Sequence, residues 1–396
     1  MTHTDIVVAG HICLDVIPTF PEHTGKFETL LVPGKLVNVD PAVIATGGTV
    51  SNTGLTLHRL GIPTTLMGKI GKDAFGEAVL HYLRTHADSL TGGMILADDE
   101  PTSYSIVISP PGVDRIFLHC PGANDSFCAD DVDMATLEGT KLFHFGYPPL
   151  MRQMYLNEGA ESLRLLQRVK NGGITTSLDM AYPDPDSEAG QVDWERVLGK
   201  VLPYVDVFLP SFDEILFMLD RPRFQAYQEN EESALAIDAE LLSVLTGRLL
   251  DMGAAIVGLK LGSQGFYLRT TPSVERLRRM GANTPPDLSG WIGRELLAPC
   301  FQANLVGTTG AGDCTIAGFL AGFLQQQSVE QAMISAVAVG GFNVESADAT
   351  TGIPDWETVQ TRIRNGWNQH QSPLPKDRWR WEHTHSLWFG SHDNIW

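Results

Sequence analysis

Two hydrophobic periods alternate along most of this chain. Short apolar runs at residues 6–10, 64–70, 141–145, 175–179, 205–209, 255–260 and 265–268 are typical of buried strands. Helical spacing occupies residues 49–60, 73–86, 157–170 and 194–202, the first of which stops at Gly61. Strands that alternate with helices predict an α/β fold, with a central, mostly parallel sheet covered on both faces.

A second pattern interrupts this alternation near the N-terminus. Residues 103–119 alternate apolar and polar positions around Pro110-Pro111-Gly112, which predicts a hairpin. The preceding stretch, residues 12–46, carries further short β-like pieces between Pro and Gly residues. We expect pieces near 12–46 and 101–120 to form a small β lid beside the main sheet.

Two segments lack either period. Residues 271–299 contain Pro and Arg with little periodicity, so we expect an insertion or a long loop. The second segment without a period is the Trp-rich tail at residues 366–396. We therefore divide the chain into a domain at residues 1–365 and this tail. Five tryptophans are too many to leave in solvent, so the tail should pack on the domain or on a partner subunit; they are Trp367, Trp379, Trp381, Trp388 and Trp396.

Charge and cysteine content narrow the classes of partner. The 396 residues carry a formal net charge of -19, which opposes binding to nucleic acid or to an anionic membrane surface. Any anionic ligand therefore needs a local pocket of hydrogen-bond donors. Five scattered cysteines form no Cys-x-x-Cys pair. The N-terminus lacks the basic residues of a secretory signal, and the longest apolar run, 316–324, is too short to span a membrane, so we expect a cytoplasmic protein.

The strongest chemical signal is the run Gly-Thr-Thr-Gly-Ala-Gly-Asp at residues 307–313, followed by an apolar helical pattern. A loop of small residues that enters a helix presents unpaired N–H groups at the positive end of the helix dipole, which favours an anion such as phosphate. Asp313 places a carboxylate beside that anion, where it can take a proton from an attacking hydroxyl. The alternative is that Asp313 merely caps the helix.

Further short motifs accompany this run in a fixed order. They are Thr-Gly-Gly-Thr-Val-Ser-Asn at 46–52, Gly-Lys-Ile-Gly-Lys-Asp-Ala-Phe-Gly at 68–76, Pro-Gly-Ala-Asn at 121–124 and Lys-Leu-Gly-Ser-Gln-Gly at 260–265. Each alone is weak, but together with residues 307–315 the set resembles the ribokinase-like (PfkB) family of carbohydrate kinases. The resemblance covers roughly residues 5 to 360. It implies a three-layer ribokinase-like sandwich and a kinase that uses ATP and Mg²⁺.

The family pattern also implies roles for individual residues. Asp313 would be the general base, and the amides of Gly310, Ala311 and Gly312 would hold the transferred phosphoryl group. On the substrate side, hydroxyls would be bound by Asp15, Gly47, Gly48, Asn52 and Asn124. The nucleotide side would comprise Ser211, Lys260, Gly262, Gly265, Thr308 and Asn343. Glu214 would join the magnesium site through water.

Several positions depart from the family pattern. Ser211 stands where the family has Asn, and Gly307 stands where many relatives have Asp, which leaves dependence on a monovalent cation open. Cys13 replaces a sugar-binding Asn of ribokinase, and Tyr147 follows a strand where ribokinase has an acidic ligand, so ribose is not the expected substrate. Arg115, in the predicted hairpin, is a candidate contact for a substrate phosphate.

Alternatives to a simple sugar kinase therefore stay open. The same fold serves kinases of nucleosides or of phosphorylated sugars, and the changes at Ser211 and Gly307 are compatible with a non-catalytic ligand-binding relative. No Gly-x-Gly-x-x-Gly follows the first strand, which argues against a dehydrogenase. His383 and His385 lack neighbouring ligands at metal-binding spacing. Lids of this family often pair between subunits, so a homodimer through the lid is expected as one possibility.

Overall fold

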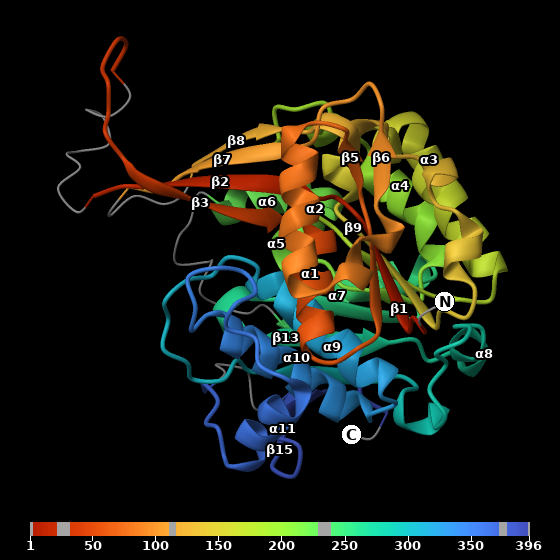
Figure 1. Cartoon of the computed structure of the whole chain (residues 1–396). Helices are drawn as coiled ribbons and strands as arrows, with labels where there is room; N and C mark the ends of the chain where they lie inside the picture. The colour runs from red at the N-terminus through yellow and green to blue at the C-terminus, as the bar shows by residue number, and fades with distance from the viewer. Residues whose placement is uncertain (1–2, 22–31, 111–115, 229–238, 372–377, 395–396) are drawn as a thin grey trace.

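The computed structural model describes residues 3–21, 32–110, 116–228, 239–371 and 378–394. These residues build one ten-stranded sheet (Figure 1). Its parallel part runs, in spatial order, through β4 (Thr64–Met67), β1 (Ile6–Gly10), β9 (Leu142–Gly146), β10 (Thr175–Asp179), β11 (Val207–Phe208) and β12 (Ile256–Lys260). Antiparallel strands continue the sheet with β13 (Phe266–Thr270), β14 (Glu295–Ala298), β16 (Leu387–Gly390) and β15 (Trp379–Glu382).

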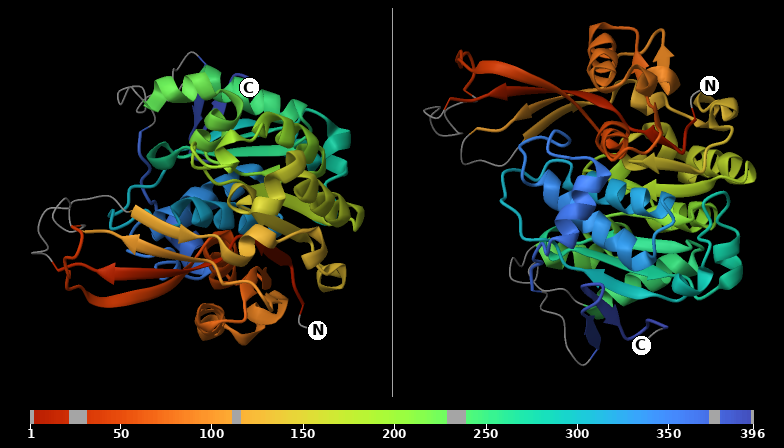
Figure 2. Two further views of the ribbon diagram at one scale, coloured as in Figure 1. Left: turned by 90° about the horizontal axis from the view of Figure 1, so that it is seen from above. Right: turned by 60° about the horizontal axis from the view of Figure 1, so that its bottom comes forward.

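Helices cover both faces of this sheet (Figures 1 and 2). Successive side chains of β1 alternate between two cores, since Ile6 and Val8 belong to one and Val7 and Ala9 to the other. The first core includes α1 (Thr49–Arg59), α9 (Ala311–Leu324) and α10 (Val329–Asn343). The second includes α3 (Arg152–Asn171), α4 (Trp194–Val201), α5 (Phe212–Leu219) and α7 (Ala239–Asp251). The predicted three-layer α/β fold with its mostly parallel sheet is confirmed.

The remaining helices lie around these layers. They are α2 (Ala74–His86), α6 (Arg221–Gln228), α8 (Val274–Arg278) and α11 (Trp356–Arg364). The predicted helix at 157–170 is part of α3, which begins earlier and breaks at Leu156–Gly159, where Asn157 and Glu158 have positive φ. Among the described residues, no helix has both the length and the apolar surface needed to cross a membrane.

A separate four-stranded sheet projects from this body (Figure 1). Its order is β3 (Asp40–Gly47), β2 (Cys13–Thr19), β7 (Tyr104–Ile108) and β8 (Ile116–Cys120), and we call it the small sheet. These strands come from the stretches predicted to form the lid, and β7 and β8 form the expected hairpin. The single strand predicted at 64–70 is wrong: it divides into β4 and β5 (Lys69–Gly71), and β5 pairs with β6 (Ile95–Ala97) instead.

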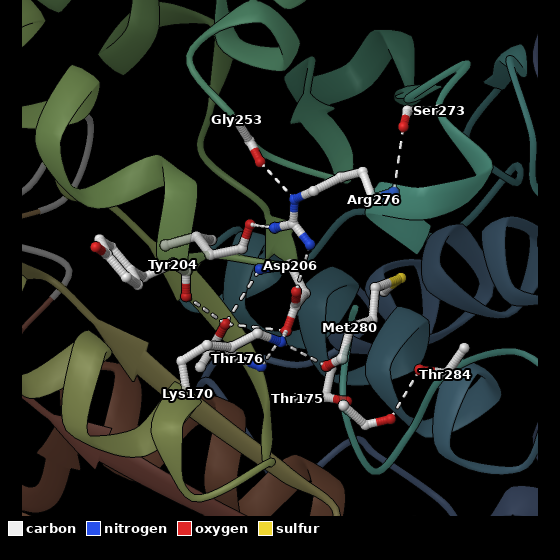
Figure 3. Close-up of polar contacts among 12 residues, drawn as sticks. Lys170, Thr175, Thr176, Tyr204, Asp206, Gly253, Ser273, Arg276, Met280 and Thr284 are labelled. Carbon is white, nitrogen blue, oxygen red and sulfur yellow. Dashed lines mark hydrogen bonds and ion pairs between the residues drawn. The ribbon is translucent and has the colours of Figure 1, made fainter. Parts of the chain in front are cut away.

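The segment at 271–299 was predicted to be an insertion or a long loop, and the long loop is wrong. The segment forms α8 and β14, and a buried ion network attaches α8 to the sheet (Figure 3). Asp206 has no exposed surface and accepts from Lys170 Nζ and, at 2.8 Å, from Arg276 Nη1. Arg276 also donates to the carbonyl of Gly253 at 2.7 Å. α8 and β14 are too short to show a hydrophobic period in the sequence. Contacts with distant residues fix their positions instead.

The tail also forms strands that its sequence pattern does not reveal. β16 pairs with β14 and with β15, so the hairpin extends the main sheet. Trp379 is buried with its ring 6.0 Å from that of Tyr267. Asp393 accepts from Arg294 Nε at 3.0 Å, and both side chains are fully buried. The Trp-rich tail is therefore attached to the domain by pairing, by aromatic contacts and by an ion pair.

Candidate active site

The Gly-rich loop lies at the N-terminus of α9, on the wall of a cavity of about 1090 Å³. Gly310 adopts φ 73°, a left-handed conformation that favours glycine, and it precedes the first helical residue, Ala311. Thr308, Gly310, Ala311 and Gly312 all line the cavity. The amides of a first helical turn have no partner within their own helix, so this wall of the cavity can bind an anion.

Asp313 lies in that same turn and is only 4% exposed. Its carboxylate accepts hydrogen bonds from α1, with Asn52 Nδ2 2.9 Å from Oδ2 and Thr53 Oγ1 3.2 Å from Oδ1. The hydroxyl of Tyr147 lies 2.8 Å from both oxygens. The structure therefore places Asn52, assigned from the sequence to substrate hydroxyls, in direct contact with Asp313, which the sequence did not predict. Neither Thr53 nor Tyr147 was assigned to this contact, because no local motif marks a residue that converges from another element.

Lys260 closes the cavity beside the Gly-rich loop. Its Nζ lies 2.7 Å from Oδ1 of Asp179, which is fully buried at the end of β10. Burial alone would lower the pKa of Lys260, but the carboxylates of Asp179, Glu214 and Asp313 outweigh it and raise that pKa. The stem of Lys260 lies 3.4 Å from the place where a Cβ on Gly312 would stand. A permanent positive charge therefore lies next to the anion loop. Asp179 was missed, although its place at the carboxyl end of a parallel strand is a usual position for site residues.

Ser211 and Glu214 both line the cavity at the start of α5. The amide of Ser211 donates to Glu214 Oε2 at 2.7 Å, and Ser211 Oγ accepts from the Glu214 amide at 3.3 Å. This reciprocal pair is a capping box, so Ser211 caps α5 at the position where the family has Asn. Glu214 lies in the first turn of α5 and is buried.

The substrate-side glycines stand where side chains crowd the backbone. A Cβ on Gly47 would lie 2.4 Å from Oδ2 of Asp15, and one on Gly48 would lie 2.5 Å from Nδ1 of His11. Asp15 is partly buried and accepts from Cys13 Sγ at 3.3 Å. Burial raises the pKa of the Asp15 carboxyl, and hydrogen bonds from Cys13 and Ser105 oppose that rise. Glycine therefore lets this loop approach the polar ends of β1 and β2.

His11 is a further polar group at this position that the sequence did not single out. It is 3% exposed, and neither ring nitrogen has a hydrogen-bond partner among the described residues. Its ring centroid lies 5.4 Å from that of His119 and 6.1 Å from that of Tyr147. Burial, and then the nearby His119, lower the pKa of His11 to about 3. The imidazole is therefore neutral at physiological pH.

Six predicted ligands are not among the residues that line this cavity, namely Asp15, Gly47, Gly48, Asn52, Asn124 and Asn343, and the amides of the last two are used on the backbone. Asn124 is fully buried, and its amide is used on Ile12, with Nδ2 donating to the carbonyl at 2.9 Å and Oδ1 accepting from the amide at 3.2 Å. Asn343 lies behind the Gly-rich loop and donates to the carbonyls of Thr309 and Ala349 at 3.1 and 2.8 Å. In this conformation both residues brace the backbone of the site rather than face a ligand.

Other residues that line the cavity are glycines and side chains with apolar surface. Gly262 and Gly265 border it with φ of 57° and 119°, and a Cβ on Gly265 would lie 2.1 Å from the carbonyl oxygen of Ala298. Tyr227, Leu241 and Leu242 line the same cavity and were not predicted, since their apolar character alone does not distinguish them from core residues. The candidate phosphate contact Arg115 lies outside the described residues.

Comparisons with known proteins agree with this geometry. Residues 3–356 match the pfkB family of carbohydrate kinases. An uncharacterized sugar kinase of Archaeoglobus fulgidus is 26% identical over 298 residues, which are 75% of this chain and 98% of that protein. An ATP-dependent 6-phosphofructokinase of Thermoanaerobacterium thermosaccharolyticum is 22% identical over 360 residues, or 90% of this chain and 93% of that protein.

Solved structures share the fold at low identity. Fructokinase from Xylella fastidiosa with bound ATP has a TM-score of 0.67 and 17% identity, covering 91% of this chain and 99% of that one. Arabidopsis thaliana ribokinase complexed with ribose and ATP has a TM-score of 0.66 and 17% identity, covering 92% and 99%. The family match spans nearly the whole chain. The chain therefore belongs to the pfkB family of carbohydrate kinases, and it is a phosphotransferase that acts on sugars.

Proposed function

We propose that this kinase transfers the γ-phosphoryl group of ATP to a hydroxyl of a small sugar-like substrate, with Asp313 as the general base. One observation carries the proposal. The Asp313 carboxylate and the Gly310–Gly312 amides belong to the same turn at the N-terminus of α9, on one wall of the cavity. A phosphoryl group held by those amides lies next to a carboxylate that can take the proton of the attacking hydroxyl.

The mechanism follows from the charges around that turn. The acceptor hydroxyl gives its proton to a carboxylate oxygen of Asp313 as its own oxygen attacks the γ-phosphorus. The bond from that phosphorus to the β,γ-bridging oxygen breaks, and ADP leaves. The amides of residues 310–312 stabilise the charge that develops on the transferred phosphoryl oxygens. Lys260, held by Asp179, adds a positive charge beside the same loop. Thr308, Gly262 and Gly265 border the path of the nucleotide, and the apolar surface of Tyr227 and Leu241 suits its base.

Glu214 is the residue that we assign to the metal site. Its carboxylate lines the cavity, and carboxylate oxygens are ligands that suit Mg²⁺. Among the described residues there is no group of three or more His, Cys, Asp or Glu side chains arranged to hold a metal. This fits an ion carried mainly by ATP phosphates and water, with Glu214 in contact through water. When bound, Mg²⁺ would screen the negative charge of the phosphates.

The acceptor would lie between the small sheet and the main sheet. Asp15 offers a carboxylate to substrate hydroxyls, Asn52 offers an amide, and Gly47 and Gly48 let a polyol approach the backbone. Cys13 and the neutral His11 make this wall different from the one implied for ribokinase. The small sheet then serves as a lid that keeps water from the γ-phosphate.

The decisive experiment is a screen for ADP release that depends on ATP and Mg²⁺. The panel contains free sugars, polyols, sugar phosphates and nucleosides, which separates the sugar proposal from the nucleoside and phosphosugar alternatives. Asp313→Asn should lower kcat by about a hundredfold or more with a modest effect on binding, given the usual contribution of a general base. Asp355→Asn is the matched control, because Asp355 caps α11 by accepting from the Thr358 amide. The N-cap of α9 is Gly310, and the Asp313 side chain caps no amide, so the predicted alternative of a helix cap is wrong. Equal effects of the two substitutions would refute the assignment of Asp313 as the general base.

We also propose that the small sheet pairs with the same sheet of a second copy. Its strands leave apolar side chains in solvent, with Val43 53%, Ile44 46%, Phe117 55% and Leu118 53% exposed. An apolar surface of this kind usually marks an interaction site. Light scattering after size-exclusion chromatography should give a dimer for the wild type and a monomer for Phe117→Asp. A monomeric wild type would contradict this proposal without affecting the assignment of Asp313.

A further inference from the structure

Three side chains donate hydrogen bonds to the Asp313 carboxylate, and the hydroxyl of Tyr147 bridges both of its oxygens. A carboxylate has about four lone-pair sites, two on each oxygen. Asn52 takes one on Oδ2, Thr53 takes one on Oδ1, and the hydroxyl of Tyr147 is shared between both oxygens at 2.8 Å. A general base can accept a proton only where a lone pair faces the incoming hydroxyl. Of the three donors, only Tyr147 lines the cavity together with Asp313, so its hydroxyl covers the side of the carboxylate that an acceptor in the cavity would approach.

The three donors differ in how firmly the fold holds them. Asn52 and Thr53 lie in the first turns of α1, and both are buried. Tyr147 lies directly after β9, is partly buried and lines the cavity. Its backbone has φ 67°, a left-handed conformation that costs a non-glycine residue energy and is concentrated at functional sites. Tyr147 is therefore the donor that can give way.

We propose that Tyr147 occupies the place of the acceptor hydroxyl at Asp313 in the substrate-free enzyme, and that a bound acceptor displaces it. The proposal rests on the assignment of Asp313 as the general base. Tyr147 is then a positioning residue: its hydroxyl keeps water away from Asp313 when ATP is bound and no acceptor is present. Its effect should be seen as a low rate of ATP hydrolysis when no acceptor is present.

The surroundings of Tyr147 suit such an exchange. Burial, followed by the charges of Asp313 and Asp179, raises the pKa of the phenol well above its usual value, so the group remains a donor. His11 lies beside it, with a centroid separation of 6.1 Å and two buried nitrogens that have no partner among the described residues. A displaced phenol hydroxyl thus has a neighbouring polar group available as a new acceptor.

Tyr147→Phe tests the proposal because it removes only the hydroxyl. We expect ADP release from ATP and Mg²⁺ in acceptor-free buffer to rise about tenfold, the usual scale for one hydrogen bond to a charged group. The double variant Tyr147→Phe, Asp313→Asn should return to the wild-type rate or below it. Tyr267→Phe is the matched control, since the Tyr267 hydroxyl donates to the buried carboxylate of Glu295 at a distance of 2.7 Å. Neither residue lines the cavity of the active site. This control should leave ADP release unchanged.

A rate of acceptor-free ADP release that is unchanged or lower in Tyr147→Phe would overturn the proposal. A second measurement uses the wild type and avoids any effect of the substitution on folding. In protein carrying ¹³Cζ-tyrosine, the signal that Tyr147→Phe removes should shift when a saturating acceptor is added; an unshifted signal would equally contradict displacement. If no compound of the panel is phosphorylated, the proposed function fails, whereas the Asp313-dependent ADP release of Tyr147→Phe still decides the role of Tyr147.

Discussion

The ammonium group of Lys260 and the carboxylate of Asp179 lie 2.7 Å apart, across the carboxyl ends of β12 and β10. β11 separates the two strands in the sheet, so the ion pair spans it. The pair holds a positive charge next to Gly312 in the Gly-rich loop. It also leaves Oδ2 of Asp179 buried without a hydrogen-bond partner among the described residues. An arrangement that leaves such an atom unpaired suggests a site shaped for catalysis rather than for stability.

Lys260→Met should therefore impair phosphoryl transfer more than it impairs folding. We expect a fall in kcat of about tenfold or more, because the phosphoryl oxygens lose a charged neighbour. Steady-state kinetics with varied ATP would show whether the loss lies in kcat or in KM. Lys200→Met, at a partly exposed lysine on α4 that pairs with Glu158, is the control and should leave turnover unchanged. Equal activity of the Lys260 and Lys200 variants would remove Lys260 from the mechanism.

Asp206 should be essential for stability rather than for activity. Asp206→Asn leaves the cations of Lys170 and Arg276 partly uncompensated in a buried position (Figure 3). Breaking a buried ion pair in this way usually costs about 3–5 kcal/mol. Urea unfolding followed by circular dichroism measures the loss. Glu275→Gln, which breaks an exposed pair between α8 and Arg279 directly after it, should change the midpoint far less.

Acid should destabilise the protein through His144. This residue is fully buried between Thr49 and Ser177, and burial, followed by the charge of Lys260, lowers its pKa to about 3. The unfolded chain takes up a proton near pH 6.5, while the folded protein does not. Stability is thus retained above pH 6.5 and is lost as the pH falls toward 3.

For His144 alone we expect a loss of about 2 kcal/mol between pH 8 and pH 5. Unfolding curves in urea at the two pH values measure that difference. His144→Gln should reduce the difference, even if the variant is less stable at both pH values. His81→Gln, on an exposed position of α2, should preserve it. A pH dependence that is the same in wild type and His144→Gln would contradict the prediction.

The C-terminal hairpin should contribute strongly to stability. Trp379 is buried beside Tyr267, so Trp379→Ala should cost about 3–5 kcal/mol through lost burial and the cavity that remains. Trp381, two residues along the same strand, is only partly buried and packs edge-on against Trp388. Trp381→Ala should lower the midpoint of thermal unfolding less. If neither substitution changes the midpoint, the hairpin is dispensable for the fold.

Local motifs and long periodic segments explain what could be predicted from the sequence. The loop before α9 is contiguous, and α1, β10 and α4 are long or regular enough to show their period. Tyr147, Asp179 and His11 are different, because each reaches the site from a strand end far along the chain; Tyr147 is 166 residues from Asp313. Only the folded sheet brings such residues together. The short elements α8, β14, β15 and β16 were missed for the related reason that pairing and ion contacts define them, not composition.

The contact between Asn52 and Asp313 also has a consequence for synthesis of the protein. The two residues are 261 positions apart. At about 5–20 residues per second, a ribosome needs roughly 13 to 52 seconds to pass from one to the other. During that interval the nascent chain contains the polar residues of α1 but neither the carboxylate nor the loop that they serve. We therefore expect a nascent chain that ends before residue 313 to be unable to transfer the phosphoryl group of ATP, so that catalytic competence arises only after that residue has been added.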